Sequence, residues 1–110
     1  MEKFVWKESE MDWRNPMPGV NFTTLTYEEG KFSIHLMRFA TGFSHPPETH
    51  DMAEYVYVLK GKSETMIGTE TFITKAGDYF VIPANVPHAV VVLEDVELMG
   101  IIAPPRPDLR

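Results

Sequence analysis

The sequence has 110 residues, a formal net charge of -6, 44% hydrophobic residues and no cysteine. A chain of this length builds one domain with a single core, and the missing cysteine excludes disulfides, thiolate metal sites and a thiol nucleophile. The acidic balance and the scattered lysines and arginines argue against a nucleic-acid partner. The start, MEKFVWKESEM, lacks the apolar stretch of a signal peptide, and no apolar run approaches the roughly 20 residues of a membrane helix. We therefore expect a cytoplasmic protein with no membrane partner.

Residues 1–19 are expected to form an N-terminal arm. Large apolar side chains, among them Trp6 and Trp13, alternate there with charges, and the segment NPMPG then breaks the chain. Because tryptophan gains little from lying in water, we expect the arm to dock on the rest of its own domain or on that of a partner.

The segment 20–103 consists of short runs rich in β-branched and aromatic residues, separated by turn signals at 28–30, 60–62, 68–69, 76–78 and 83–85. The eight runs are VNFTTLTY, KFSIHLMRF, EYVYVLK, SETMI, TFITK, YFVI, HAVVVLE and VELMGII. No helical period persists across them. The pattern predicts an all-β sandwich or small barrel.

Alternation distinguishes the expected strands from one another. SETMI and ETFITK alternate small polar and apolar residues, which is typical of an exposed hairpin, here closed at Gly68. EYVYVLK and HAVVVLE are apolar on both faces, so a barrel interior would cover one face and a second layer or subunit the other. The tail 104–110 contains three prolines and is expected to be extended and irregular.

Four potential metal ligands stand at the ends of expected strands. Glu48 and His50 point to one face because strand side chains alternate in direction. Glu54 opens the next strand, and His88 opens another directly after the turn PANVP. A barrel can bring such positions together, and imidazole with carboxylate is a donor set for a non-haem divalent metal.

The spacing of these residues resembles that of a known family. Five positions follow the pattern G-x5-H-x-H-x3,4-E-x6-G, namely Gly42, Glu48, His50, Glu54 and Gly61. Three more follow G-x5-P-x-G-x2-H-x3-N, namely Gly77, Pro83 and His88. These are the two signatures of the cupin family, and the chain is similar to its small single-domain members. The resemblance implies a double-stranded β-helix, or jelly-roll barrel, over residues 20–103.

Three positions depart from the family pattern. Asn85 replaces a glycine, which is harmless because asparagine tolerates the left-handed conformation, and Val92 replaces an asparagine. Glu48 stands where the first metal-binding histidine would be.

The resemblance implies a ligand set of His50, Glu54 and His88, the two-histidine, one-carboxylate arrangement of many Fe(II) enzymes. Glu48 is then a fourth metal ligand, a catalytic base beside the metal, or the sign of a cupin that has lost its metal. Two carboxylates favour Fe(II) or Mn(II) over Zn(II) and Ni(II), without excluding copper.

Three other residues compete for functional roles. His45 precedes a proline pair at a spacing that fits no ligand register, so it is interpreted as a solvated loop residue. His35 lies mid-strand and is expected in the pocket wall or as a hydrogen-bonded core histidine. Arg38 either pairs with an acidic neighbour or anchors a substrate carboxylate.

The expected function is a metal-dependent enzyme, of dioxygenase, isomerase or lyase type, acting on a small organic molecule. A non-catalytic barrel that senses or carries a small ligand or a metal is the alternative, and a purely structural cupin is a third. Fold resemblance does not choose among them because this fold hosts many chemistries. We also expect a homodimer, with the tryptophan-bearing arm at or near its interface and with Tyr55 and Tyr57 as interface residues.

Overall fold

Two long antiparallel strands, β5 (Ala53–Ile67) and β8 (His88–Ala103), organise the fold in this computed structural model, which describes residues 3–110. The remaining strands are β1 (Arg14–Met17), β2 (Val20–Glu28), β3 (Phe32–Phe39), β4 (Ser44–Glu48), β6 (Glu70–Lys75) and β7 (Tyr79–Ile82). Single turns of 3-10 helix stand near the two ends of the chain, at η1 (Glu8–Glu10) and η2 (Pro107–Leu109).

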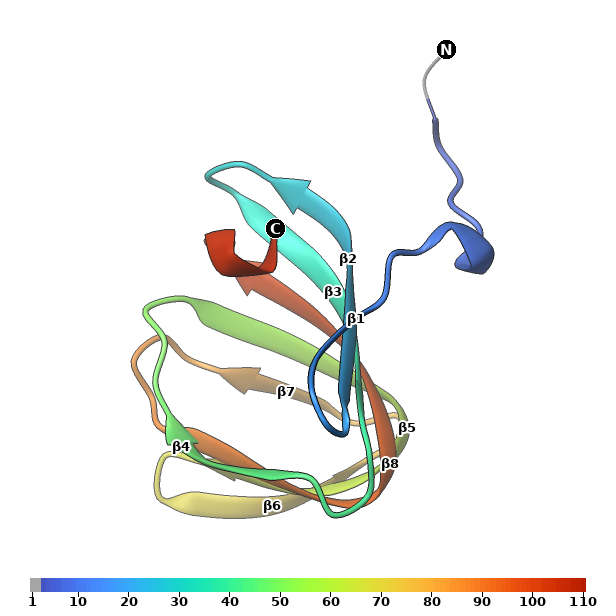
Figure 1. Ribbon diagram of the computed structural model, residues 1–110. Helices are drawn as coiled ribbons and strands as arrows, with labels where there is room; N and C mark the ends of the chain where they lie inside the picture. Colours follow the sequence, from blue (N-terminus) through green and yellow to red (C-terminus); the bar gives the residue numbers. More distant parts are fainter. Residues whose placement is uncertain (1–2) are drawn as a thin grey trace.

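The sheet folds over so that β5 and β8 each belong to two layers. In one layer the second half of β8 pairs with β3, the first half of β5 pairs with β7, and β2 and β1 extend the edge beyond β3. In the other, the first half of β8 pairs with β4, and the second half of β5 pairs with β6. The layers face each other around an interior (Figure 1), which confirms the prediction of an all-β jelly-roll barrel.

The prediction of a turn at residues 60–62 is wrong. The expected strands 54–60 and 63–67 are one strand, β5, which continues through a series of register shifts against β8. Gly61 has φ of +86°, so it changes the direction of the strand without ending it. The expected strands 88–94 and 96–102 likewise join in β8.

Two strands were not among the eight runs expected from the sequence, although extended chain was expected at Glu48, and both strands contain proline. β1 includes Pro16, and β4 includes Pro46 and Pro47. Each is a short strand bonded along one side, β1 to β2 and β4 to β8. Proline is tolerated at such edges because the ladder does not need its missing N–H, so a proline-rich run gave no strand signal.

The hairpin closed at Gly68 is present, with Ile67 paired to Glu70, but its small polar residues face the interior. The exposed fractions of Ser63, Thr65 and Thr74 are 3%, 5% and 6%. Phe72 and Ile73 are the exposed members, at 44% and 54%. The hairpin is therefore part of the barrel wall rather than a surface hairpin, and its polar face lies inside.

The packed core occupies one end of the barrel. Val58, Val92 and Val96 form it, with partly buried phenylalanines around them. On β5, Val56 and Val58 are buried while Tyr55 and Tyr57 are 38% and 43% exposed. The segment EYVYVLK is thus apolar on both faces, as the sequence indicated, but only one face is covered within this chain.

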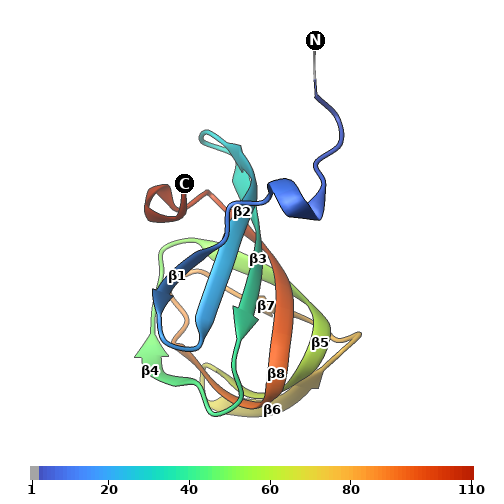
Figure 2. The ribbon, with the colours of Figure 1, turned by 45° about the vertical axis from the view of Figure 1, so that its right-hand side comes forward.

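The chain ends are attached differently. Trp13 lies under the Arg38 guanidinium, 4.0 Å from ring centroid to Cζ, whereas Trp6 is 56% exposed on a segment that extends away from the barrel (Figures 1 and 2). Residues 1–2 of the predicted arm lie outside the described residues.

The C-terminal tail folds back onto β2, where Thr24 Oγ1 donates a hydrogen bond of 2.5 Å to the Leu109 carbonyl. Within residues 3–110 the structure has no helix long and apolar enough to span a membrane.

Candidate metal centre

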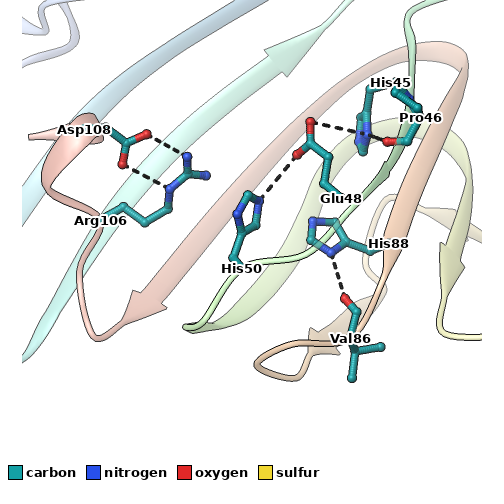
Figure 3. Close-up of polar contacts among 8 residues, drawn as sticks. All are labelled: His45, Pro46, Glu48, His50, Val86, His88, Arg106 and Asp108. Atoms are coloured by element: carbon teal, nitrogen blue, oxygen red, sulfur yellow. Dashed lines mark hydrogen bonds and ion pairs between the residues drawn. The ribbon is translucent and has the colours of Figure 1, made fainter.

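Three of the four predicted ligands meet at one mouth of the barrel. Glu48 ends β4 directly opposite His88, the first residue of β8, and His50 follows in the connection to β5. One potential ligand atom from each of Glu48, His50 and His88 lies within 4.8 Å of the others. Glu48 Oε2 is 3.4 Å from His50 Nε2, and Figure 3 shows the carboxylate between His45 and His50, with His88 beneath it.

The hydrogen bonding of His88 prepares it for coordination. Its Nδ1 lies 3.1 Å from the Val86 carbonyl oxygen, and a carbonyl only accepts, so Nδ1 carries the proton. The lone pair of a neutral imidazole is then on Nε2, and the bond to Val86 also orients the ring. His88 is 8% exposed and its ring centroid is 5.2 Å from that of His50. It is the buried member of the group.

Glu54 contributes to the same cavity but lies outside the group of three. It stands at the start of β5, paired with Ile82 on one side and Ile102 on the other, and lines the cavity wall. The carboxylate that lies with the two imidazoles is that of Glu48, the position where the family pattern has a histidine. The ligand role expected for Glu54 stays a prediction.

His45 is not the solvated loop residue that its spacing indicated. It belongs to β4 opposite Val90, lines the cavity, and has a side chain only 21% exposed. Its Nδ1 donates a hydrogen bond of 2.8 Å to the Pro46 carbonyl and is 3.9 Å from Glu48 Oε1. The unpredicted strand β4 explains the error, because a strand residue can point inward where a loop residue would not.

The donor chemistry of Glu48, His50 and His88 fits a divalent cation. Two imidazoles and one carboxylate suit Fe(II), Mn(II), Zn(II) or Ni(II), and a bound cation would compensate the negative charge of the carboxylate. Glu48, with a side chain 49% exposed, is also reachable from solvent. The arrangement can therefore bind a metal while remaining open to a ligand.

The cavity behind the cluster has a volume of about 450 Å³ and a mainly apolar lining. Its large apolar residues include Phe22, Met37, Phe39, Phe43, Phe80 and Leu98. A volume of this size is typical of pockets for small organic molecules.

The C-terminal tail adds a charged pair to the cavity mouth, which sequence reasoning missed. Arg106 and Asp108 line the cavity, and Arg106 Nη2 donates a hydrogen bond of 2.7 Å to Asp108 Oδ2 (Figure 3). This bond lowers the pKa of the Asp108 carboxyl below its usual range. The lone arginine among the tail prolines was the available signal, but only the folding of the tail over the barrel makes it part of the cavity.

The prediction for His35 is confirmed. It is 0% exposed and lines the cavity, with Nε2 2.8 Å from Ser33 Oγ and Nδ1 3.1 Å from Thr24 Oγ1. Arg38 takes the first of its two expected roles, because it lies outside the cavity, where Nε donates to Glu97 Oε2 at 2.6 Å.

Comparison with known proteins identifies the fold family. A model of the cupin domain matches residues 35–102. The pectin degradation protein KdgF of Dickeya dadantii is 29% identical over 103 residues, which cover 92% of this chain and 93% of that protein.

Two solved structures have the same fold. KdgF from Halomonas sp. superposes with a TM-score of 0.90 at 24% identity, covering 99% of this chain and 100% of that one. An RmlC-like cupin from Shewanella frigidimarina also gives a TM-score of 0.90, at 20% identity, covering 100% of this chain and 97% of that one. With the family model spanning most of the barrel, the chain belongs to the cupin family.

Proposed function

We propose that this protein is a divalent-metal enzyme that acts on a small uronic acid or a related hydroxy acid. The observation that carries the proposal is the convergence of Glu48, His50 and His88 at the mouth of a cavity of about 450 Å³. The similarity to KdgF over nearly the whole chain supports the substrate class, because pectin is a polymer of galacturonic acid.

The side chains at the mouth of the cavity have different proposed roles. His50 and His88 hold Fe(II) or Mn(II), with Zn(II) or Ni(II) as further possibilities, and Glu48 is either a third ligand or a base beside it. When bound, such an ion supplies a Lewis acid that polarises a carbonyl or hydroxyl oxygen. Arg106, held in place by Asp108, pairs with the carboxylate of the substrate. Glu54 is proposed as a further ligand of the same metal ion.

The reaction class that suits this mouth is proton transfer, as in an isomerase or a lyase. Glu48 and His45 face each other across 3.9 Å, and carboxylate and imidazole are the side chains most used for acid–base catalysis. A dioxygenase is the second candidate because its Fe(II) uses the same donor set. Oxygen consumption with turnover distinguishes it from proton transfer.

We propose that the protein works as a homodimer in the cytoplasm. The apolar outer face of β5 and β7 carries Tyr55, Tyr57, Tyr79 and Val81, each at least 37% exposed. Exposed aromatic residues in one patch are typical of a protein interface. The second copy would cover the face of EYVYVLK that this chain leaves open.

Metal binding tests the proposal most directly. We expect untagged protein to bind about one equivalent of Mn(II) or Fe(II), and His50→Ala and His88→Ala to weaken that binding at least about tenfold, since each removes a ligand. His45→Ala is the matched control and should keep the metal. Titration followed by elemental analysis makes the measurement. Wild-type protein that takes up none of Fe, Mn, Ni or Zn would mean a cupin that has lost its metal.

Two further variants and a substrate mixture define the chemistry. If the Glu48→Ala variant no longer binds metal, Glu48 is a ligand. If the variant keeps the metal but loses turnover, Glu48 is a base. The same two measurements on Glu54→Ala assign the role of Glu54. NMR of an enzymatic digest of polygalacturonate, incubated with the metal-loaded protein, shows any conversion. Thermal stabilisation by the digest without conversion supports the non-catalytic binder instead.

A further inference from the structure

Three hydroxyl side chains form a polar patch inside the mainly apolar cavity. Ser63 and Thr65 lie on β5 and Thr74 on β6, and all three line the cavity. Ser63 and Thr74 are paired across the two strands, and Thr65 lies two residues from Ser63 on the same face. We call Ser63, Thr65 and Thr74 the hydroxyl patch.

The hydroxyl patch has more hydrogen-bonding capacity than the protein uses. Ser63 Oγ is buried and lacks a hydrogen-bond partner within the part of the chain that the structure describes. Thr65 Oγ1 and Thr74 Oγ1 share one bond of 2.9 Å, which uses only one of their two O–H donors. A buried hydroxyl without a partner destabilises the folded state. The unused capacity therefore points to an oxygen-bearing group that the cavity receives.

Strand register gives the distance between the hydroxyl patch and the metal centre. Across β5 and β8, Ile67 lies opposite His88, Thr65 opposite Val90 and Ser63 opposite Val92. At about 3.4 Å per residue, Thr65 is about 7 Å and Ser63 about 14 Å along the strand from the row of His88. A ligand held at the metal centre must have the length of a six-carbon chain to reach Thr65 and about twice that length to reach Ser63.

We propose that the hydroxyl patch is a second binding subsite, which accepts the oxygen-rich end of a polyhydroxy acid whose other end lies at Glu48, His50 and His88. The Thr65–Thr74 pair donates one hydrogen bond to such an acid, and Ser63, which lies deeper, donates a second to an acid about two sugar units long. The patch selects such acids over short acids, which reach only the mouth. The inference extends the proposed function, since it requires the ligand to enter the same cavity.

Two acids of different length test the subsite. Digalacturonate, with two sugar units, is long enough to span from the mouth to Ser63, and glycolate is not. Calorimetric titration of both, with and without Mn(II), is carried out on wild-type protein, Ser63→Ala, Thr65→Val and the control Ser44→Ala, whose serine is exposed on β4. We expect Ser63→Ala to raise the Kd for digalacturonate about fivefold and to leave that for glycolate unchanged. Ser44→Ala should change neither.

Stability gives an independent reading of Ser63. Because its hydroxyl has no partner among the described residues, Ser63→Ala should melt at the same temperature as wild-type or higher. Ser33→Ala, which removes the 2.8 Å bond to His35, should melt lower. A lower melting temperature for Ser63→Ala with unchanged affinity for digalacturonate would assign Ser63 a structural role and overturn the subsite.

The remaining outcomes separate the two proposals. Binding of Mn(II) and of both acids, with no effect of Ser63→Ala, overturns the subsite and leaves the metal function standing. Binding of digalacturonate that is weakened by Ser63→Ala, with no uptake of Mn(II), supports the subsite and contradicts the metal function. Failure of wild-type protein to bind digalacturonate overturns the subsite.

Discussion

At the scale of single residues, His35 is held as a neutral imidazole in the cavity wall. Thr24 donates its only O–H to the Leu109 carbonyl, so Thr24 Oγ1 accepts from His35 Nδ1, and Nε2 accepts from Ser33. Burial, and then the charges of Arg106 and Arg14, lower its pKa from 6.5 to about 4. The same chain of bonds attaches the C-terminal tail, so the charge state of His35 bears on the position of Arg106.

This pKa predicts a loss of stability in mild acid. Above 6.5 the imidazole is neutral in both the folded and unfolded states, so it has no effect on stability. As the pH falls from 6.5 to about 4, only the unfolded chain binds the proton, which costs up to about 3 kcal/mol of folding free energy.

Urea denaturation of wild-type protein and His35→Gln at pH 7 and pH 5 measures the effect. Glutamine keeps hydrogen-bonding groups but does not titrate. We expect the wild type to lose about 2 kcal/mol more than the variant between these two pH values. Equal losses in the two proteins would show that His35 is not the group responsible.

At the scale of elements, Gly61 lets β5 continue past a point where another residue would end it. A Cβ on Gly61 would lie 2.0 Å from the Asp95 backbone oxygen, and φ is +86°. Both the conformation and the close approach of β8 therefore require glycine. The two layers of the barrel share β5, so a break there would separate Glu54 from the hydroxyl patch.

Gly61→Ala and Gly77→Ala form a matched pair. Gly77 has φ of +95°, but a Cβ added there would have nothing within 4 Å, so its substitution costs only backbone strain, about 1–2 kcal/mol. We expect Gly61→Ala to cost at least about 2 kcal/mol more, or to prevent folding, because the clash with backbone adds to the strain. Thermal denaturation and the yield of folded protein provide the comparison. Similar melting temperatures would mean that β8 moves away at little cost.

At the scale of the whole molecule, the outer face of the β7–β5–β8 layer is the surface that this chain leaves uncovered. Strand register places Val81, Tyr55 and Ile101 in one row, and Tyr79, Tyr57 and Met99 in the next. Residues directly opposite each other in a sheet point to the same side, so these two rows form one apolar patch. Its position opposite the cavity side of β5 leaves the metal centre accessible in a dimer.

Light scattering at micromolar concentration should give twice the mass of the chain. Tyr57→Glu places a charge in the patch and is expected to shift the protein to monomer while leaving metal binding intact. Lys31→Glu, at the exposed turn between β2 and β3, is a charge-changing control that should stay dimeric. A monomeric wild-type protein, or dimers in both variants, would exclude this face as the interface.

Much of the fold was predictable because it depends on local signals. Alternating β-branched and aromatic runs identified most of the barrel strands, and the left-handed conformation expected at Asn85 is present, with φ of +64°. The sequence predicted strand ends at Gly61 and near Asp95, where β5 and β8 in fact continue. The error at Gly61 arose because a glycine in a turn and a glycine in a bent strand look alike in sequence. The proline-containing strands β1 and β4 gave no signal of their own.

By itself, the sequence determined that the chain is all-β, and it predicted a common site for Glu48, His50, Glu54 and His88 at the ends of expected strands. Alternation along a strand is local, so it can be inferred without knowing the fold. Only the tertiary structure decided which side of each strand faces the interior. Closing the sheet placed Glu48 rather than Glu54 beside the imidazoles, brought Arg106 from the tail to the mouth, and turned Ser63 inward. These contacts join residues far apart in the chain, and no local pattern specifies them.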